Sequence, residues 1–394
     1  MDNGRRLFSA ALLMLLMASP LSCGSRTVTY NEVIGERMTA AVEKVMRENQ
    51  APGAIVGVWW SGDGQFVKAF GLADTVSGRK MSTADLWKIA SITKTFTAEV
   101  VLQLVSEGKV GLDQRLSSFS FSQGLANADR ITVRQLLNHT SGYPDLENDD
   151  KDFQILRFGE PTRIWTHEEI LGWGRTLKPL SQPGEIYHYT NFGYYLLGLI
   201  IEETTGNTAA DEIEARCAQK LGLSNTRLSD MPDYILSKPH SEGYCVRSGL
   251  PDGIILPGDE EVMDAIGWNT TAGWTSAGVV SGLADLKKWI EAVAKGTQLS
   301  PEMYFAQLET VPITDQPNGP GYGLGVVLMQ TGLGEFHFHN GATLGYSSYA
   351  ASLADNSITI VVFVNIMPTA KGNTTPATDI ATALFGILQD KAAK

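Results

Sequence analysis

A serine and a lysine three positions apart begin an apolar periodic segment, in Ser91-Ile92-Thr93-Lys94. A serine hydroxyl is a poor nucleophile until a neighbouring base removes its proton. On a helix, side chains three residues apart share one face, so the Lys94 amine can reach the Ser91 hydroxyl. The spacing therefore predicts nucleophilic catalysis at Ser91, although the same pair could be a helix cap and a solvated lysine.

The chain contains the same spelling a second time, in Ser77-Gly78-Arg79-Lys80. Ser77 and Lys80 flank a glycine in a polar stretch typical of a turn. Ser91 instead precedes apolar residues at i+4 spacing, and Gly108 closes the predicted helix; these residues are Ile92, Phe96, Val100 and Leu104. Only Ser91 therefore stands where the free N–H groups of a helix N-terminus favour developing negative charge.

A Tyr-x-Asn follows further along the chain, at Tyr189 and Asn191, just before a second apolar helix. A tyrosine beside a nucleophile can shuttle its proton if Lys94 and neighbouring positive charge lower the pKa of the phenol. The Asn191 amide can hold a substrate carbonyl. The alternative is a packed aromatic side chain followed by a helix cap.

The third element is His339-Asn340-Gly341, at the end of a segment in which phenylalanine and histidine alternate. This alternation predicts a half-buried strand. Gly341 would let a substrate backbone approach the strand edge closely. The next amide, of Ala342, could pair with the Ser91 amide to form an oxyanion hole.

His337 and His339 also share one face of the predicted strand, as two metal ligands would. No carboxylate or cysteine cluster stands beside them in the sequence, so a zinc site is the weaker alternative.

The remaining patterns predict the elements that position these residues. A helix around Ile34 and Met46 leads into a hairpin, residues 54–60 and 65–70, turned by Asp63-Gly64. Residues 85–310 are predicted to be mainly helices and long loops. Strands are predicted at 323–328, 335–339, 346–353 and 358–365, before a final amphipathic helix. The order predicts an α+β fold, with an antiparallel sheet built from both chain ends, flanked by helices, and an inserted helical lobe.

Several further segments share one resemblance: 131–142 (ITVRQLLNHTSG), 183–198 (PGEIYHYTNFGYYLLG), 274–286 (WTSAGVVSGLADL), 322–325 (YGLG) and 339–346 (HNGATLGY). With the S-x-x-K element, the chain resembles serine hydrolases of the β-lactamase-related, penicillin-recognising superfamily. The likeness falls on the branch of D-alanyl-D-alanine carboxypeptidases, class C β-lactamases and related esterases. It implies a β-lactamase/transpeptidase-like α/β fold in a catalytic domain at 30–390, with a sheet lobe (30–80 plus 315–390) and a helical lobe (about 85–310).

The resemblance also implies roles for single residues. Ser91 would be the acylated nucleophile, and Lys94 and Tyr189 the proton-transfer pair, with either as the resting base. His339 would replace the lysine of a K-T-G strand, supplying a proton partner or positive field. The implied substrate-binding residues are Asn191, Trp274, Asn340, Gly341 and Ala342. No cofactor is implied.

Two departures from the carboxypeptidase pattern bear on the substrate. Asn340 stands where a hydroxyl often holds the substrate's terminal carboxylate, and residues 326–328 are Val-Val-Leu where an arginine can serve the same end. Since a bidentate guanidinium holds a carboxylate best, selection for free carboxylates should be weak. We therefore expect a serine acyl hydrolase most like a D-alanyl-D-alanine carboxypeptidase or penicillin-binding protein. An esterase or β-lactamase is the alternative, ahead of a catalytically silent penicillin-binding-like receptor or a zinc hydrolase.

Composition agrees with a large exported enzyme. The chain has 394 residues, 43% of them hydrophobic, enough for a large core. A net charge of −12 argues against nucleic acid as a partner. The expected partner is a peptide, ester or β-lactam substrate, and no GxGxxG or P-loop context indicates a nucleotide.

The first 23 residues predict an export signal, because Arg5 and Arg6 precede an apolar run too short to span a membrane. Cys23 could carry a lipid anchor after cleavage, or the signal could simply be removed. The protein would then be periplasmic, membrane-anchored or secreted. Cys217 and Cys245 would remain as a pair that could form a disulfide in an oxidising compartment.

Overall fold

The protein was analysed as a computed structural model, which describes residues 30–61, 64–229, 236–251, 253–254, 258–314, 319–372 and 375–392. The predicted export segment and its Cys23 lie outside these residues. No helix in the described ranges combines the length and apolarity needed to cross a bilayer.

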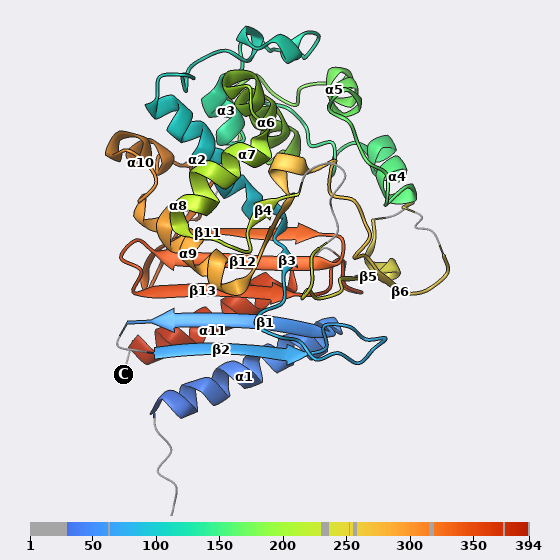
Figure 1. Cartoon of the computed structure of the whole chain (residues 1–394), viewed down its shortest axis with the longest axis vertical. Helices are drawn as coiled ribbons and strands as arrows, with labels where there is room; N and C mark the ends of the chain where they lie inside the picture. The colour runs from blue at the N-terminus through green and yellow to red at the C-terminus, as the bar shows by residue number, and fades with distance from the viewer. Residues whose placement is uncertain are drawn as a thin grey trace, which may run out of the picture.

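An eight-stranded antiparallel sheet crosses the lower half of the molecule in Figure 1, in the order β2-β1-β13-β12-β11-β10-β9-β8. The N-terminal hairpin supplies two of its strands, and the rest come from the C-terminal part of the chain: β1 (Gly53–Trp60), β2 (Gly64–Gly71), β8 (Val311–Pro312), β9 (Gly321–Tyr322), β10 (Val327–Thr331), β11 (Gly334–Thr343), β12 (Tyr346–Leu353) and β13 (Ile358–Val364). Both ends of the chain therefore build one sheet, as the sequence predicts.

The sheet separates two hydrophobic cores, and successive side chains of β13 point alternately into one core and the other. Ile360, Val362 and Val364 face a core shared with α1 (Tyr30–Asn49) and α11 (Pro376–Ala392). Val361 and Phe363 face the opposite way, into the larger core. Successive strand residues point to opposite faces, so a continuous apolar strand marks a sheet covered on both sides.

The larger core is made mostly of helices, which lie above the sheet in Figure 1. They are α2 (Thr93–Ser106), α3 (Val133–Leu137), α4 (Lys151–Gly159), α5 (His167–Thr176), α6 (Asn191–Thr205), α7 (Ala209–Ile213), α8 (Gln219–Leu221), α9 (Leu283–Lys295) and α10 (Pro301–Gln307). Among them α9 packs directly on β12 and β13, although it lies within the range predicted for the helical lobe. The division into two lobes by residue range stays a prediction.

Two small sheets connect the layers. One is β3 (Trp87–Lys88), β7 (Val279–Ser281) and β4 (Arg227–Leu228), and the other is β5 (Tyr244–Val246) with β6 (Val262–Asp264). The sequence patterns did not predict either, because strands of two or three residues carry no readable alternation.

Two strand predictions differ from the structure. Most of the strand predicted at 323–328 is a turn between β9 and β10, in which Gly323 N–H donates to Val326 O at 2.8 Å and Gly325 has φ +88°. The strand predicted at 335–339 runs on to Thr343, because its pairing with β12 continues to the Thr343–Tyr346 register.

The two described cysteines are not joined. Cys217 lies buried in the larger core, and Cys245 lies on β5 in a separate small cluster; both are free thiols. The disulfide considered for this pair is therefore not formed.

Candidate active site

Ser91 lies in a tight 3-10 turn (η1, Ala90–Ile92) between β3 and α2, two residues before the regular helix begins at Thr93. Ala90 has φ +49°, in the left-handed region that is strained for a residue with a side chain and is often found at functional sites. The serine was predicted at the start of a helix, and the structure places it in the turn that leads into that helix.

Gly341 of β11 makes room for this turn. A Cβ at Gly341 would lie 2.3 Å from Ile89 O and 2.4 Å from Ser348 Oγ, closer than packing allows. Ser348 Oγ already donates to Ile89 O at 2.7 Å. The missing side chain of Gly341 is therefore needed for the close approach of the nucleophile turn, and its predicted contact with a substrate backbone stays a prediction.

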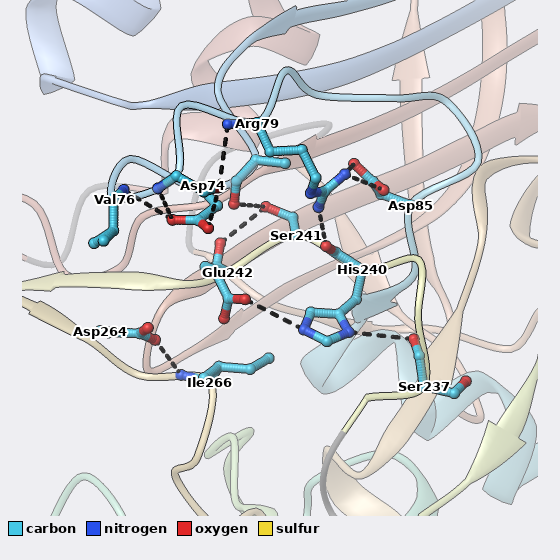
Figure 2. Close-up of polar contacts among 12 residues, drawn as sticks. Asp74, Val76, Arg79, Asp85, Ser237, His240, Ser241, Glu242, Asp264 and Ile266 are labelled. Carbon is cyan, nitrogen blue, oxygen red and sulfur yellow. Dashed lines mark hydrogen bonds and ion pairs between the residues drawn. The ribbon is translucent and has the colours of Figure 1, made fainter.

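A polar network holds the segment that leads into this turn (Figure 2). The Arg79 guanidinium donates to both oxygens of the fully buried Asp85, at 2.9 and 3.1 Å, and also to His240 O. His240 in turn lies 3.4 Å from a carboxylate oxygen of Glu242. Since β3 follows Asp85 by two residues, this network fixes the strand that positions Ser91.

Lys94 is completely buried, and its amine has three polar neighbours. Lys94 Nζ lies 2.7 Å from Asn191 Oδ1, 3.0 Å from Ser276 O and 3.2 Å from Ser91 Oγ. Burial lowers the pKa of Lys94 to about 7, while Asp145 and Glu147 oppose this shift. A neutral amine has two N–H bonds. Both are taken by the two carbonyl acceptors, so its lone pair is left facing the Ser91 hydroxyl.

Tyr189 contacts the same serine through a hydrogen bond between the two hydroxyl groups. Burial raises the pKa of the Tyr189 phenol well above its usual value, and the bond to Ser91 offsets this only in part. Lys94 Nζ also lies 4.8 Å from the centre of the Tyr189 ring. The condition set for Tyr189, a pKa lowered by neighbouring positive charge, is therefore not met, because burial dominates the pKa of this phenol.

His339 is buried between two partners that define its protonation. Its Nδ1 lies 2.6 Å from Asn340 O, so this nitrogen carries the proton, and Nε2 accepts from the Tyr322 hydroxyl at 3.0 Å. Burial, and next the charge of Lys94, lower the pKa of His339 to about 3. His339 is therefore neutral and cannot supply the positive field that was one of its two predicted roles.

Ser91 opens into a cavity of about 540 Å³ between α6, β11 and the loops that follow β5 and β13. Asn191, Asn340 and Ala342 also line it, so the structure brings these predicted residues together with the serine. Trp274 does not line this cavity: it is 4% exposed and packs against the rings of His167 and Tyr195. Trp274 is therefore a core residue and not the substrate contact that was predicted. From the same segment, it is the backbone carbonyl of Ser276 that contacts Lys94.

The sequence patterns missed two charged residues of this cavity, Glu147 and Arg157. Arg157 Nη1 donates to Glu147 Oε2 at 2.6 Å, and Phe158, Leu250 and Leu344 provide an apolar wall nearby. Arg157 comes from α4, far from every motif, so no spacing in the sequence could place it here.

The second serine–lysine pair forms no such site. Ser77 donates to Asp74 in an exposed turn, and its side chain makes no contact with Lys80 that resembles the Ser91–Lys94 pair. In the described part of the chain, His, Cys, Asp and Glu side chains nowhere form a group of three that could hold a metal ion. His337 and His339 are both buried, with Glu335 beside His337 and Tyr322 beside His339.

Comparison with known proteins points in one direction. The sequence profile of the family described as Beta-lactamase matches residues 38–385. Among curated proteins, esterase EstB of Burkholderia gladioli is 28% identical over 312 residues, which is 74% of this chain and 79% of the esterase. Penicillin-binding protein 4* of Bacillus subtilis (strain 168) is 27% identical over 317 residues, 77% of this chain and 66% of that protein.

Among solved structures, a D-stereospecific amidohydrolase from Streptomyces sp. superimposes with a TM-score of 0.77 at 26% identity. The match covers 89% of this chain and 98% of the amidohydrolase. The chain thus spans nearly the whole of this structure, but about two thirds of the penicillin-binding protein.

Proposed function

The chain belongs to the Beta-lactamase family of penicillin-recognising serine hydrolases, and from this premise we propose that it hydrolyses its substrate through an acyl-enzyme on Ser91. The observation that carries the proposal is the arrangement around Lys94. Two carbonyl acceptors occupy its N–H groups, and the third direction leads to Ser91 Oγ. Few structural roles would require a buried lysine with this set of neighbours.

In the first step, neutral Lys94 takes the proton of Ser91 as the serine oxygen attacks the substrate carbonyl. The Ser91 and Ala342 amides would stabilise the developing oxyanion. The proton then passes to the leaving group as its bond to the acyl carbon breaks. Water attacks the resulting ester by the same route in reverse, which returns the serine and releases the acid.

Tyr189 would act in this scheme as a neutral hydroxyl. Because its phenol resists ionisation, it is suited to relay a proton between Ser91 and the leaving group rather than to rest as a phenolate. The buried, low-pKa amine makes Lys94 the resting base of the pair. His339 would orient the Tyr322 hydroxyl behind Tyr189, as a neutral group.

The acyl donor is proposed from the walls of the cavity. The apolar side chains of Phe158 and Leu344 suit a hydrophobic or aromatic acyl group, and relatives are named for an ester, for penicillin binding and for D-amides. Among the described lining residues, the one charged pair is Arg157 with Glu147, and these two side chains balance each other's charge. We therefore favour uncharged leaving groups over free D-alanine carboxylates, with a carboxypeptidase as the second candidate.

Matched substrates test this choice: an acyl-D-alanyl-D-alanine with a free carboxylate, its C-terminal amide, and a corresponding ester. The amide and ester should turn over at least as well as the free acid, since a buried carboxylate without a charged partner is costly to bind. A kcat/KM about a hundredfold higher for the free acid, about 2.7 kcal/mol, would contradict this. Arg157→Gln would then remove the preference if Arg157 is the missing cation.

We also propose that the protein is exported. The support is the sequence of residues 1–23, with Cys23 as the point at which a lipid anchor would attach. Mass spectrometry of the mature N-terminus distinguishes a lipidated Cys23 from simple cleavage and from an uncleaved chain.

A further inference from the structure

The side-chain amide of Asn191 has one polar neighbour on each side: one neighbour requires a hydrogen-bond acceptor and the other requires a donor. On one side its Oδ1 accepts from Lys94 Nζ at 2.7 Å. On the other, its Nδ2 donates to Asp145 Oδ2 at 3.0 Å, and its backbone N–H donates to Asp145 Oδ1 at 3.0 Å. An asparagine amide that turns over exchanges its donor and acceptor ends.

Asp145 removes this ambiguity. Its side chain is 1% exposed, and an ionised carboxylate only accepts hydrogen bonds. The Asn148 amide also donates to Asp145 Oδ2, and the Asp145 N–H donates to Asp149 Oδ2 at 2.8 Å, so the loop holds the carboxylate in place. If the Asn191 amide turned over, its oxygen would face a carboxylate and its NH₂ group would face the Lys94 amine.

We propose that Asp145 is a positioning residue for the Ser91 reaction: it orients the Asn191 amide so that the amide oxygen faces Lys94. This inference rests on the proposed function of Ser91 and Lys94. The consequence reaches the nucleophile in three contacts. Asp145 fixes Asn191, Asn191 occupies one N–H of Lys94, and the lone pair of Lys94 is thereby left to Ser91.

A purely structural role is the alternative. Asp145 also accepts from the first backbone N–H of α6, where a carboxylate stabilises a helix N-terminus. A carboxylate that only stabilises α6 and places its charge near Lys94 would affect folding and the Lys94 titration, but restoring a complementary pair at positions 145 and 191 would then not recover kcat.

The test is Asp145→Asn, read by an NMR titration of Lys94 labelled at Cε. The NH₂ group introduced at position 145 should turn the Asn191 amide over. The loss of the Asp145 negative charge also makes the protonated form of Lys94 less favourable. The groups that face Lys94 include the carboxylates Asp145 and Glu147 and the neutral rings of His139, His339 and Tyr189. The Lys94 titration should therefore move to lower pH. The plateau kcat should fall about tenfold or more, because the base is misdirected.

Two companions isolate the effect of orientation. Asp152→Asn removes an exposed carboxylate in the first turn of α4, outside the contacts of Asp145 and Asn191, and should leave the Lys94 titration in place. The exchange Asp145→Asn with Asn191→Asp restores a complementary pair and brings a carboxylate to Lys94. It should recover most of the plateau kcat and move the titration above that of the unmodified protein.

A Lys94 titration unchanged in Asp145→Asn would overturn the inference, as would an exchange variant no better than the single one. The titration needs no turnover. A protein that lacks acylation at Ser91 but shows the predicted Lys94 shift would therefore refute the proposed function while keeping the influence of Asp145 on Lys94.

Discussion

A lysine that serves as a base near neutral pH must be kept from holding a proton, and burial of Lys94 does this. Burial lowers the pKa of the Lys94 amine, and the carboxylates Asp145 and Glu147 raise it only in part, without contacting the amine directly. Tyr189 experiences the same desolvation with the opposite result, since burial favours the neutral form of both groups. The pair is therefore poised as an amine base beside an un-ionised hydroxyl.

If Lys94 and Tyr189 form one proton-transfer unit, their losses should not multiply. Lys94→Met and Tyr189→Phe should each lower kcat/KM by about 10²- to 10⁴-fold, and the double variant should be about as slow as the slower single one. Steady-state kinetics on one ester substrate measures this. Single effects that multiply in the double variant would show that the two residues act independently.

At this scale the sequence predicted which residues meet but not their charge states. The motifs supplied Ser91, Lys94, Tyr189 and Asn191, because the spacings of catalytic groups are short and local. The pKa shifts of Tyr189 and His339, and the presence of Arg157 in the cavity, depend on neighbours brought from distant segments. Such neighbours leave no pattern in a single sequence.

At the scale of elements, the nucleophile turn is held between β3 before it and α2 after it, and it is pressed against β11. The contact with β11 requires glycine at 341, since any side chain there would meet Ile89 O and Ser348 Oγ. Strand β11 therefore supports the nucleophile turn through Gly341 and also presents Asn340 and Ala342 to the cavity.

Gly341→Ala should consequently displace the turn that carries Ser91. We expect a loss of about tenfold or more in kcat/KM, together with a destabilisation of about 1 to 3 kcal/mol from overpacking. Denaturant unfolding and ester hydrolysis measure the two effects. Gly386→Ala is the matched control, since Gly386 lies on the exposed face of α11, where a Cβ meets no atom within 4 Å and alanine is the better helix former. Full activity and stability in Gly341→Ala would refute the close packing.

The long amphipathic elements were predictable and the short ones were not. Helices α1, α6 and α11 and strands β12 and β13 fall where their apolar periods indicate. The turn at Gly325 and the extension of β11 to Thr343 depend on hydrogen bonds made to other segments. The ends of these strands are thus set by hydrogen bonds to neighbouring strands, which the local amino-acid composition does not reveal.

At the scale of the whole molecule, the larger core contains a carboxylate whose charge is costly. Glu99 of α2 is 1% exposed, and burial raises its pKa to about 8, against the opposing effects of Gln307 and Lys220. The folded protein thus keeps a proton that the unfolded chain releases above about pH 4.5. Stability contributed by this group is present at low pH and is lost as the pH rises from about 4.5 to about 8.

Glu99→Gln should remove this loss. We expect its free energy of unfolding to exceed that of the unmodified protein by up to about 4 kcal/mol at pH 8 and to match it near pH 4.5. Denaturant titrations at the two pH values measure the difference, with Glu43→Gln on the exposed side of α1 as control. Equal stabilities at pH 8 would mean that Glu99 is ionised in the fold without cost.

The central claim is that Ser91 is the acylated residue, and intact mass followed by peptide mapping tests it most directly. The protein is incubated with a labelled penicillin and, in parallel, with an activated ester. We expect one adduct on the peptide that contains Ser91, lost in Ser91→Ala and retained in Ser77→Ala. An adduct that persists in Ser91→Ala, or no adduct with either reagent, would contradict it.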